Sequence, residues 1–287
     1  MSTENNPVRI AVASGKGGTG KSCVSSSLVL SRDSVTAVDA DVEEPNLSLL
    51  LDQTLHRQKD VTVLVPEIDP SVCTRCGKCS NYCLYGALTQ IGNNPPLLNK
   101  NLCHNCGVCS MVCPPNAITE IPYRVGEIRS ALDKQPRIVE GRIDIGTVNS
   151  IPVIKEALRE ASRLGDLMVI DCPPGTSCPV VACMEDADFV LLVTEPTPFG
   201  LSDLEMALEL ATMLKKDCGI IVNRSDLAGE DLHGLSERYN APILASFPFS
   251  RNIAEAYAQG ISPIKVDKLW EKGIGSVWEF LEREVLS

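Results

Sequence analysis

The sequence is short of aromatic residues, of histidine and of long apolar runs. Only 4% of its 287 residues are Phe, Trp or Tyr and three are His, so small aliphatic side chains must fill most of the core. No run approaches the ~18 apolar residues of a membrane-spanning helix. The opening stretch, MSTENNPVRI, lacks the apolar segment of a signal peptide. We therefore expect a soluble, cytoplasmic protein.

Positive charge is also scarce. The 26 Lys and Arg residues are outnumbered by 37 Asp and Glu residues, which gives a net charge of -11. Binding to nucleic acid or to an anionic membrane depends on clustered basic side chains, so we expect neither partner. Residues 267–285 carry apolar side chains at helical spacing but also five acids against three bases. This balance favours a helix packed on the domain over a membrane anchor.

Cysteine, by contrast, is abundant. Eight of the 13 cysteines fall between Cys73 and Cys113, and in a reducing compartment such a group indicates metal or redox chemistry. Residues 73–91 and 103–121 align at an offset of 30, with nine of 19 positions identical and only four of those nine being cysteines. The segment is therefore expected to contain a duplicated small unit.

Each unit has the spacing C-x2-C-x2-C-x3-C, which is the bacterial ferredoxin signature. In that pattern the fourth cysteine of each run serves the other cluster, and thiolates suit iron. The sequence therefore predicts two [4Fe-4S] clusters. The first ligand set is Cys73, Cys76, Cys79 and Cys113, and the second is Cys103, Cys106, Cys109 and Cys83. Two four-cysteine zinc sites are the alternative.

Residues 15–22 read GKGGTGKS and fit the phosphate-binding pattern G-x4-G-K-[ST]. Glycines let the backbone wrap closely around phosphates, with its N–H groups at a helix N-terminus. Lys21 is placed to reach the β and γ phosphates, and the Ser22 hydroxyl to ligate Mg²⁺. The sequence thus predicts ATP or ADP with Mg²⁺, held by Gly15, Lys16, Gly17, Gly18, Thr19, Gly20, Lys21 and Ser22.

Outside the cysteine-rich segment, apolar strands alternate with helical patterns, which implies a parallel sheet with helices on both faces. Strands are expected from residue 8 and at 34–41, 61–66, 167–171, 188–195, 218–223 and 242–247, and helices up to about 32 and at about 151–163, 201–216, 251–259 and 267–285. We expect a mostly parallel P-loop NTPase domain of residues 1–66 and 122–287. A small α+β ferredoxin-like domain, residues 67–121, is inserted into it.

A second lysine inside the loop, Lys16, gives the KGGTGKS form of the motif, and here the chain resembles the MinD/ParA-type P-loop ATPases. That group includes the nitrogenase iron protein and the Mrp-type iron–sulfur carriers. The resemblance implies a homodimer that forms on ATP binding, with Lys16 crossing to the partner's nucleotide as an arginine finger does. A solvated loop lysine is the alternative. With the inserted cluster segment, the resemblance covers nearly the whole chain and extends to the ATPases of the orange protein complex.

The resemblance also assigns roles to acids at strand ends. Asp39 and Asp41 close the segment VDAD. Asp41 would orient the attacking water, with Lys16 and Lys21 as the other catalytic residues, while Asp39 would contact the metal shell or Lys21. Asp171, in LMVIDCPPG, would hold a magnesium water. Acids that only cap turns are the alternative for Asp39 and Asp41.

Further nucleotide contacts follow from the same resemblance. Asn223 and Arg224 end the segment IIVNR, and Pro248 lies in FPFSRNIAEAYAQG, where relatives bind adenine. Cys23 stands where relatives usually carry a threonine that helps hold the α-phosphate, and a thiol is a weaker donor. A plain turn at the strand end is the alternative for the adenine contacts.

Five cysteines lie outside the duplicated segment, and four of them follow it in the chain. Cys178 comes seven residues after Asp171, as does a ligand of the bridging cluster in the nitrogenase iron protein, but the second ligand of that cluster has no counterpart here. Cys178 is therefore expected to be a buried small residue, with a transient metal contact at the dimer interface as the alternative. Cys172, Cys183 and Cys218 are expected in the core, since free cysteine packs as a small hydrophobe.

The expected function is ATP hydrolysis coupled to the clusters. They would serve electron transfer or metal-cofactor assembly on a metalloprotein partner. A spatial-positioning ATPase of the cell-division type, with the clusters as redox sensors, is the alternative. No cysteine follows Cys218, so the C-terminal CxxC mechanism of the Mrp-type carriers is unsupported. Eight committed ligands favour permanent redox centres over delivered cargo.

Overall fold

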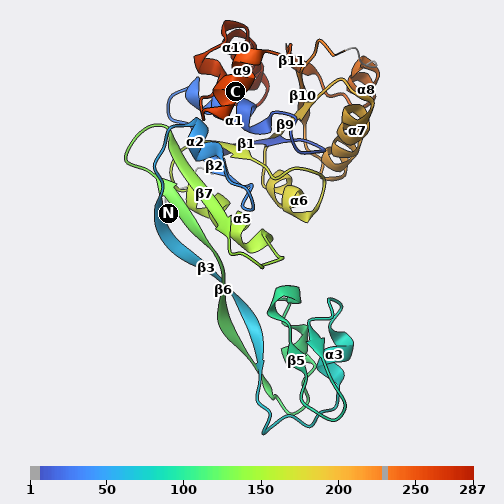
Figure 1. The fold of residues 1–287 in the computed structure, drawn as a ribbon. Helices are drawn as coiled ribbons and strands as arrows, with labels where there is room; N and C mark the ends of the chain where they lie inside the picture. The colour runs from blue at the N-terminus through green and yellow to red at the C-terminus, as the bar shows by residue number, and fades with distance from the viewer. Residues whose placement is uncertain (1–6, 228–231) are drawn as a thin grey trace.

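The computed structural model describes residues 7–227 and 232–287, and a nine-stranded sheet forms its centre (Figure 1). The strand order is β11 (Ile243–Phe247), β10 (Cys218–Asn223), β9 (Phe189–Thr194), β1 (Val8–Ala13), β8 (Leu167–Asp171), β2 (Thr36–Asp39), β7 (Arg137–Ile143), β6 (Ile118–Ala131) and β3 (His56–Ile68). Neighbours from β11 to β7 run parallel, whereas β6 and β3 are antiparallel additions. The prediction of a mostly parallel α/β sheet is confirmed.

Helices cover both faces of the sheet, because side chains alternate between two cores along each buried strand. In β1, Ala11 and Ala13 face one core, while Ile10 and Val12 face the other. The first core is closed by α5 (Ile151–Ala161), α6 (Cys178–Glu185), α7 (Pro198–Met213) and α8 (Leu232–Arg238). The second is closed by α1 (Lys21–Leu30), α2 (Leu47–Leu50), α9 (Arg251–Ala258), a 3-10 turn (Pro263–Lys265) and α10 (Lys268–Glu284).

The apolar face of α10 is buried in the second core, which confirms the prediction of a packed C-terminal helix. Its buried residues are Trp270, Ile274, Val277, Trp278 and Leu281. The Trp270 ring stacks on Phe247 at 4.0 Å between centroids, and its Nε1 donates to Ser27 Oγ at 2.8 Å. Among the described residues, none of the helices combines the length and apolar character needed to cross a bilayer.

Replacement of Trp270 by alanine is expected to destabilise the fold by about 3–5 kcal/mol, the usual cost of removing a buried aromatic side chain. Trp270 is 1% exposed and bridges α1, α10 and β11. Leu269→Ala is the matched control on the same helix, because Leu269 is 67% exposed and should change stability by less than about 0.5 kcal/mol. Urea denaturation of both variants measures the difference, and equal midpoints would contradict the assignment.

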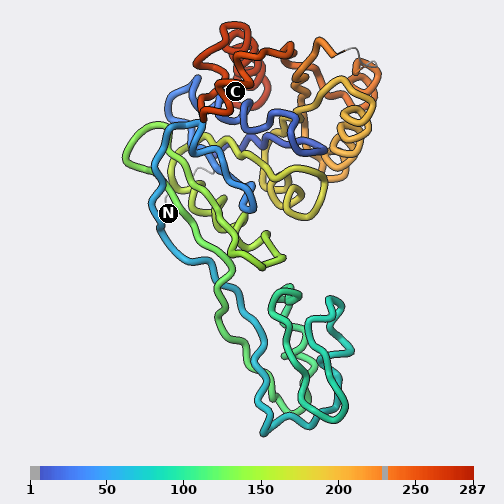
Figure 2. The backbone as a smooth tube through the Cα atoms, viewed as in Figure 1, coloured from blue at the N-terminus to red at the C-terminus, as the bar shows by residue number. Residues whose placement is uncertain are grey.

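Strands β3 and β6 form a ribbon that projects from the edge of the sheet. They pair from His56 and Ser130 at the root to Ile68 and Ile118 at the tip. Only Gly126 onward in β6 also pairs with β7, so the eight residues 118–125 extend beyond the sheet. Figures 1 and 2 show this twisted ribbon leading to the small cysteine-rich lobe, so both ends of the lobe are tied to the same edge.

A row of charged residues crosses the root of the ribbon. Asp171 is in register with Asp39, Asp39 with Glu140, and Glu140 with Arg129. The Glu140 carboxylate is buried and accepts hydrogen bonds from Arg129 and from Ser48 of α2, each at 3.3 Å. Burial raises the pKa of Glu140, and the charge of Arg129 opposes this shift. The ribbon is thus joined by adjacent polar side chains to the carboxyl ends of β2 and β8.

The cysteine-rich lobe contains only short elements. These are α3 (Lys78–Tyr82), β4 (Leu88–Thr89), β5 (Leu97–Leu98), a 3-10 turn (Lys100–Leu102) and α4 (Val108–Met111). Its backbone repeats at an offset of 30, with left-handed φ angles at Arg75 and Asn105 (59° and 58°), Gly77 and Gly107 (71° and 72°), and Gly86 and Asn116 (64° and 53°). The duplication seen in the sequence is therefore present in the chain conformation as well.

Candidate nucleotide pocket and cysteine sites

The glycine-rich loop joins β1 to α1 and needs its glycines for two reasons. Gly18 and Gly20 have φ angles of 81° and 102°, which side-chain-bearing residues rarely adopt. A Cβ on Gly15 would lie 2.1 Å from the carbonyl oxygen of Asp203 in α7. The buried Thr19 Oγ1 has no hydrogen-bond partner among the described residues, so the loop offers an unused polar group.

A pocket opens beside this loop where five predicted segments meet. It is lined by Gly17, Gly18, Gly20, Lys21, Ser22, Cys23, Asp41, Pro174, Asn223, Arg224 and Pro248, and also by Glu44, Asn46, Phe249, Ser250, Ile253, Ala254 and Tyr257. Asn223 Nδ2 donates to the carbonyl of Thr19 at 2.8 Å, and Arg224 pairs with Glu195 at 3.1 Å. The structure therefore brings most of the predicted nucleotide contacts into one cavity.

One wall of the pocket was not foreseen residue by residue. Phe249 and Tyr257 are 55% and 42% exposed and line the cavity with Ile253. Together they offer an apolar surface of the kind that suits a flat base. Both aromatic residues lie in the segment assigned to adenine, and their presence in a sequence with few aromatics is the signal that marks them.

Three aspartates stand near the loop, but they have different surroundings. Asp41 lines the pocket, and burial raises its pKa to about 6 although Lys21 opposes the shift. Asp171 is 1% exposed behind the pocket, where its carboxylate accepts a hydrogen bond from Ser25 Oγ at 2.8 Å. Burial raises the pKa of Asp171, again opposed by Lys21, and the Ser22 side chain also reaches it.

Asp39 serves the backbone of the next turn. One carboxylate oxygen accepts the N–H groups of Asn46 and Leu47 at 2.9 and 2.8 Å, and the other accepts that of Asp41 at 3.2 Å. Burial and the charge of Asp171 raise the pKa of Asp39 well above its usual range. The structure thus places Asp39 as a cap that holds Asp41 and α2, and not on the wall of the pocket.

Lys16 and Cys23 occupy contrasting positions. Lys16 is half-buried, with its carbonyl accepting from Ser14 Oγ at 2.5 Å, and it is absent from the described residues that line the pocket of its own chain. Cys23 does line the pocket, and burial raises its pKa to about 12. The thiol is therefore neutral at physiological pH and is available only as a weak donor.

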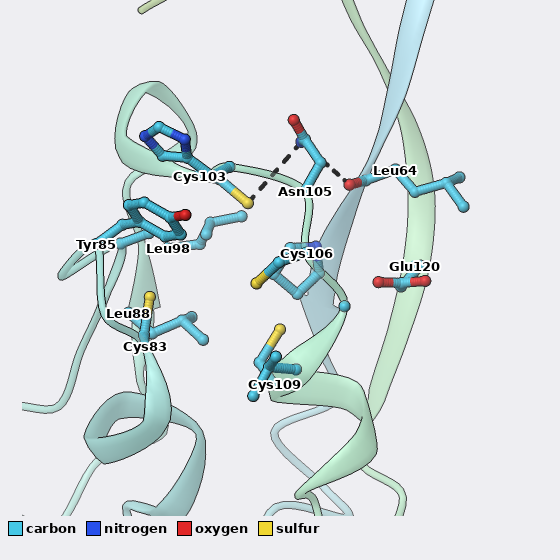
Figure 3. A pocket seen from close by; sticks show the side chains of 15 residues that line it. Leu64, Cys83, Tyr85, Leu88, Leu98, Cys103, Asn105, Cys106, Cys109 and Glu120 are labelled. Atoms are coloured by element: carbon cyan, nitrogen blue, oxygen red, sulfur yellow. Dashed lines mark hydrogen bonds between the residues drawn. The ribbon is translucent and has the colours of Figure 1, made fainter. Parts of the chain in front are cut away.

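The eight cysteines of the lobe surround two cavities, which we call site 1 and site 2. Site 1 is lined by Cys73, Cys76, Cys79 and Cys113, and site 2 by Cys83, Cys103, Cys106 and Cys109. In Figure 3 the sulfur atoms of site 2 point into a common space. The structure brings together the two crossed sets that the sequence predicts. The empty spaces measure about 320 and 400 Å³, including their open mouths.

The sites lie at different places along the ribbon. Site 1 contacts Ile68 and Ile118 at the tip, whereas site 2 contacts Leu64, Pro66 and Glu120 on the side of the ribbon. In the described residues, no group of three or more His, Cys, Asp or Glu side chains converges closely enough to hold a single metal ion. Four sulfurs spread around a cavity suit a larger, polynuclear group instead.

The remaining cysteines divide between core and surface. Cys172, Cys183 and Cys218 are buried, as predicted. Cys178 is exposed, so the prediction of a buried residue there is wrong. It is the first residue of α6, and the buried side of that helix begins at Val180.

A glycine-rich loop between the first strand and first helix of a parallel sheet, beside a pocket with buried acids, defines a P-loop nucleotide-binding protein. The family model CbiA, described as the CobQ/CobB/MinD/ParA nucleotide binding domain, matches residues 10–264. The chain belongs to this family.

The chain is also similar to other proteins and to solved structures. An uncharacterized protein of Methanocaldococcus jannaschii is 31% identical over 268 residues, which cover 91% of this chain and 93% of that protein. An iron-sulfur cluster carrier protein of Rickettsia conorii is 35% identical over 95 residues, only 32% and 30% of the two chains. The MinD cell division ATPase of Pyrococcus furiosus shares the fold, with a TM-score of 0.56, 21% identity and coverage of 95% and 99%.

Proposed function

We propose that this chain is a Mg²⁺-dependent ATPase that holds two [4Fe-4S] clusters. It couples a nucleotide-dependent homodimer to electron transfer or metal-cofactor assembly on a metalloprotein partner. The observation that carries the proposal is the pair of four-cysteine cavities on a ribbon rooted beside the nucleotide pocket. Residues 67–121 would act as the inserted ferredoxin-like domain, and 1–66 with 122–287 as the ATPase domain.

The ATPase part of the proposal rests on the pocket. Loop N–H groups and Lys21 would bind the phosphates, and Ser22 with Asp171 would hold Mg²⁺ and its water. Asp41, on the pocket wall, would orient the attacking water. Mg²⁺ supplies charge neutralisation at the transferred phosphoryl group. Asp39 would contribute by fixing the turn that carries Asp41, since its oxygens are already occupied by backbone N–H groups.

The cluster part rests on the donor chemistry. Both sites are all-cysteine, and thiolates select iron–sulfur clusters or zinc. A single zinc ion needs its four sulfurs within about 2.3 Å of the metal, and among the described residues no group of three or more such side chains converges closely enough to hold one. The iron-sulfur cluster carrier relatives match only part of the chain, but their name is consistent with iron–sulfur work.

The likeness of fold to cell-division MinD proteins favours a second candidate, a spatial-positioning ATPase with the clusters as redox sensors. The position of α10 argues against it, because the apolar face of this helix is packed in the core and is not available to a membrane.

Protein purified without oxygen is expected to be brown and to contain about eight iron and eight sulfide ions per chain, the content of two cubane clusters. Elemental analysis and visible absorbance measure this directly. Zinc at about two ions per chain, with no visible absorbance, would exclude the cluster part of the proposal and leave the ATPase part standing.

A further inference from the structure

The internal repeat makes sites 1 and 2 a matched pair, so the differences between them reduce to a few side chains. Each residue that lines one site can be compared with the residue 30 positions away in the other unit. The informative pairs are Lys78 with Val108, Gln90 with Glu120, Thr74 with His104, and Pro115 with Tyr85.

Gln90 and Glu120 occupy the same place in their units. Gln90 Oε1 lies 2.8 Å from the position of a Cβ built on Gly77, and Glu120 Oε1 lies 3.3 Å from that on Gly107. Gln90 is neutral, and its Nε2 donates to the carbonyl of Arg75 at 2.9 Å. Glu120 is an anion on the wall of site 2. Site 2 therefore has a carboxylate on its wall, whereas the equivalent residue of the first unit is a neutral amide beside Gly77 of site 1.

Lys78 and Val108 form the second informative pair. Each lies between the second and third cysteines of its run, is the first residue of a short helix (α3 or α4), and lines its own site. Site 1 thus has a cation where site 2 has an aliphatic side chain. Like the difference between Gln90 and Glu120, this one makes the surroundings of site 1 more positive than those of site 2.

Apolar side chains cover both sites. At site 2, Tyr85 and His104 stack at 3.7 Å between centroids, and Leu88, Leu98 and Leu64 add apolar wall (Figure 3). At site 1 the covering side chains are Ile68 and Ile118 of the ribbon together with Thr74, Pro96 and Pro115.

Hydrogen-bond donors reach sulfur atoms in both sites. The N–H group of Ala117 donates to Cys113 Sγ at 3.2 Å in site 1. In site 2 the Asn105 amide nitrogen is 4.0 Å from Cys103 Sγ. Reduction adds negative charge to a cluster, so positive neighbours, donors to sulfur and solvent contact all raise its potential.

From the two charge differences we infer that sites 1 and 2 are unequal electron acceptors, with site 1 at the tip of the ribbon as the stronger one. The inference rests on the proposed clusters. A four-thiolate [4Fe-4S] group changes from a net charge of -2 to -3 when it accepts one electron from a one-electron donor. An electron on site 2 passes to site 1, which oxidises one group and reduces the other, with no bond made and no proton moved.

The test uses the full chain with both clusters, titrated anaerobically with dithionite in the presence of mediator dyes and followed by electron paramagnetic resonance. The wild-type chain is expected to be reduced in two steps. Glu120→Gln should raise the potential of the lower step and leave the upper one in place. Gln90→Glu, the reciprocal variant, should lower the upper step and leave the lower one.

Each substitution should change the equilibrium constant for electron transfer between the two sites about threefold, because the added or removed charge is screened by solvent. A threefold change corresponds to a shift of ~30 mV in the potential of a one-electron couple. The inference would be overturned if both clusters of the wild-type chain were reduced at the same potential, or if Glu120→Gln shifted the potential of the upper reduction step. Iron and sulfide are measured on the same samples. Their absence would overturn the proposed clusters and the inference together, whereas intact clusters with unshifted potentials would overturn the inference alone.

Discussion

Replacement of Lys16 by alanine is expected to abolish ATP turnover while each chain still binds ATP. Lys16 lies in the phosphate loop but is absent from the described wall of its own pocket, whereas Lys21 is on that wall. A cation supplied in trans contributes about 10³–10⁵ in rate in comparable phosphoryl-transfer sites. Steady-state hydrolysis and equilibrium binding of a fluorescent ATP analogue measure the two effects separately. Lys21→Ala is the control, since it should lose binding as well.

The same residue is expected to control assembly. In an Asp41→Ala chain, which should retain nucleotide without hydrolysing it, ATP with Mg²⁺ should convert monomers into dimers. Adding Lys16→Ala in this background should weaken that dimer. Light scattering after size-exclusion chromatography reports both masses. Normal turnover by Lys16→Ala, or an ATP-bound monomer at all concentrations, would refute a role for Lys16 across the interface.

The cysteine sites give the second large effect, because crossed ligation predicts which pairs of substitutions act on the same cluster. Cys83→Ala with Cys106→Ala removes two ligands of site 2, so one cluster and about four irons should remain. Cys83→Ala with Cys76→Ala removes one ligand from each site, so both clusters should be lost.

If all four cysteines of each run instead bound the same cluster, the results of the two double variants would be reversed. Cys76 and Cys83 would then belong to one site, and their joint replacement would spare the second cluster. Iron content and the residual resonance spectrum of the two double variants distinguish the arrangements. Circular dichroism serves as a control that the ATPase sheet, which is separate from the lobe, is still folded in both.

The parallel part of the sheet could be predicted because its strands are short apolar runs buried on both faces. Strands β8 and β10 have the predicted bounds, and β9 differs by one residue at each end. Helix α7 begins at Pro198, earlier than the predicted 201. The Thr197 hydroxyl accepts the N–H of Gly200 at 3.0 Å and proline fits the first turn, so the helix starts at this cap.

Strands β6 and β7 were not predicted, because charged residues interrupt their apolar pattern. These charges find partners across the ribbon and its root. Arg124 pairs with Asp60 of β3 and with Asp144, each at 3.1 Å, and Arg129 pairs with Glu140 of β7 at 3.3 Å. Such pairs depend on the register of strands that are distant in sequence, and no local pattern reveals them. The third strand was placed at 61–66 and in fact spans His56–Ile68 for the same reason.

Some features of the candidate sites could likewise be predicted from the sequence, and others could not. The loop residues could be named because their motif is local, and the two cysteine sets because the ferredoxin signature pairs the fourth cysteine of each run with the other run. The hydrogen bonds that tie Asp39 to the turn after it depend on how residues 40–47 fold back. The exposure of Cys178 depends on where α6 meets the sheet. Neither could be read from residue types alone.

The ribbon of β3 and β6 is anchored at the edge of the sheet and carries the cysteine-rich lobe at its far end, so a rotation at the anchored end would move the lobe. The eight residues of β6 beyond β7 have a length of about 26 Å at the usual rise of an extended strand. At the anchored end, Glu140 accepts a hydrogen bond from Arg129 of β6. Glu140 is also in register with Asp39, the residue that caps the turn beside the nucleotide pocket. A tilt of about 5° at that edge would carry the tip by about 2 Å. A displacement near the nucleotide too small to alter the fold would thus change where site 1 is presented.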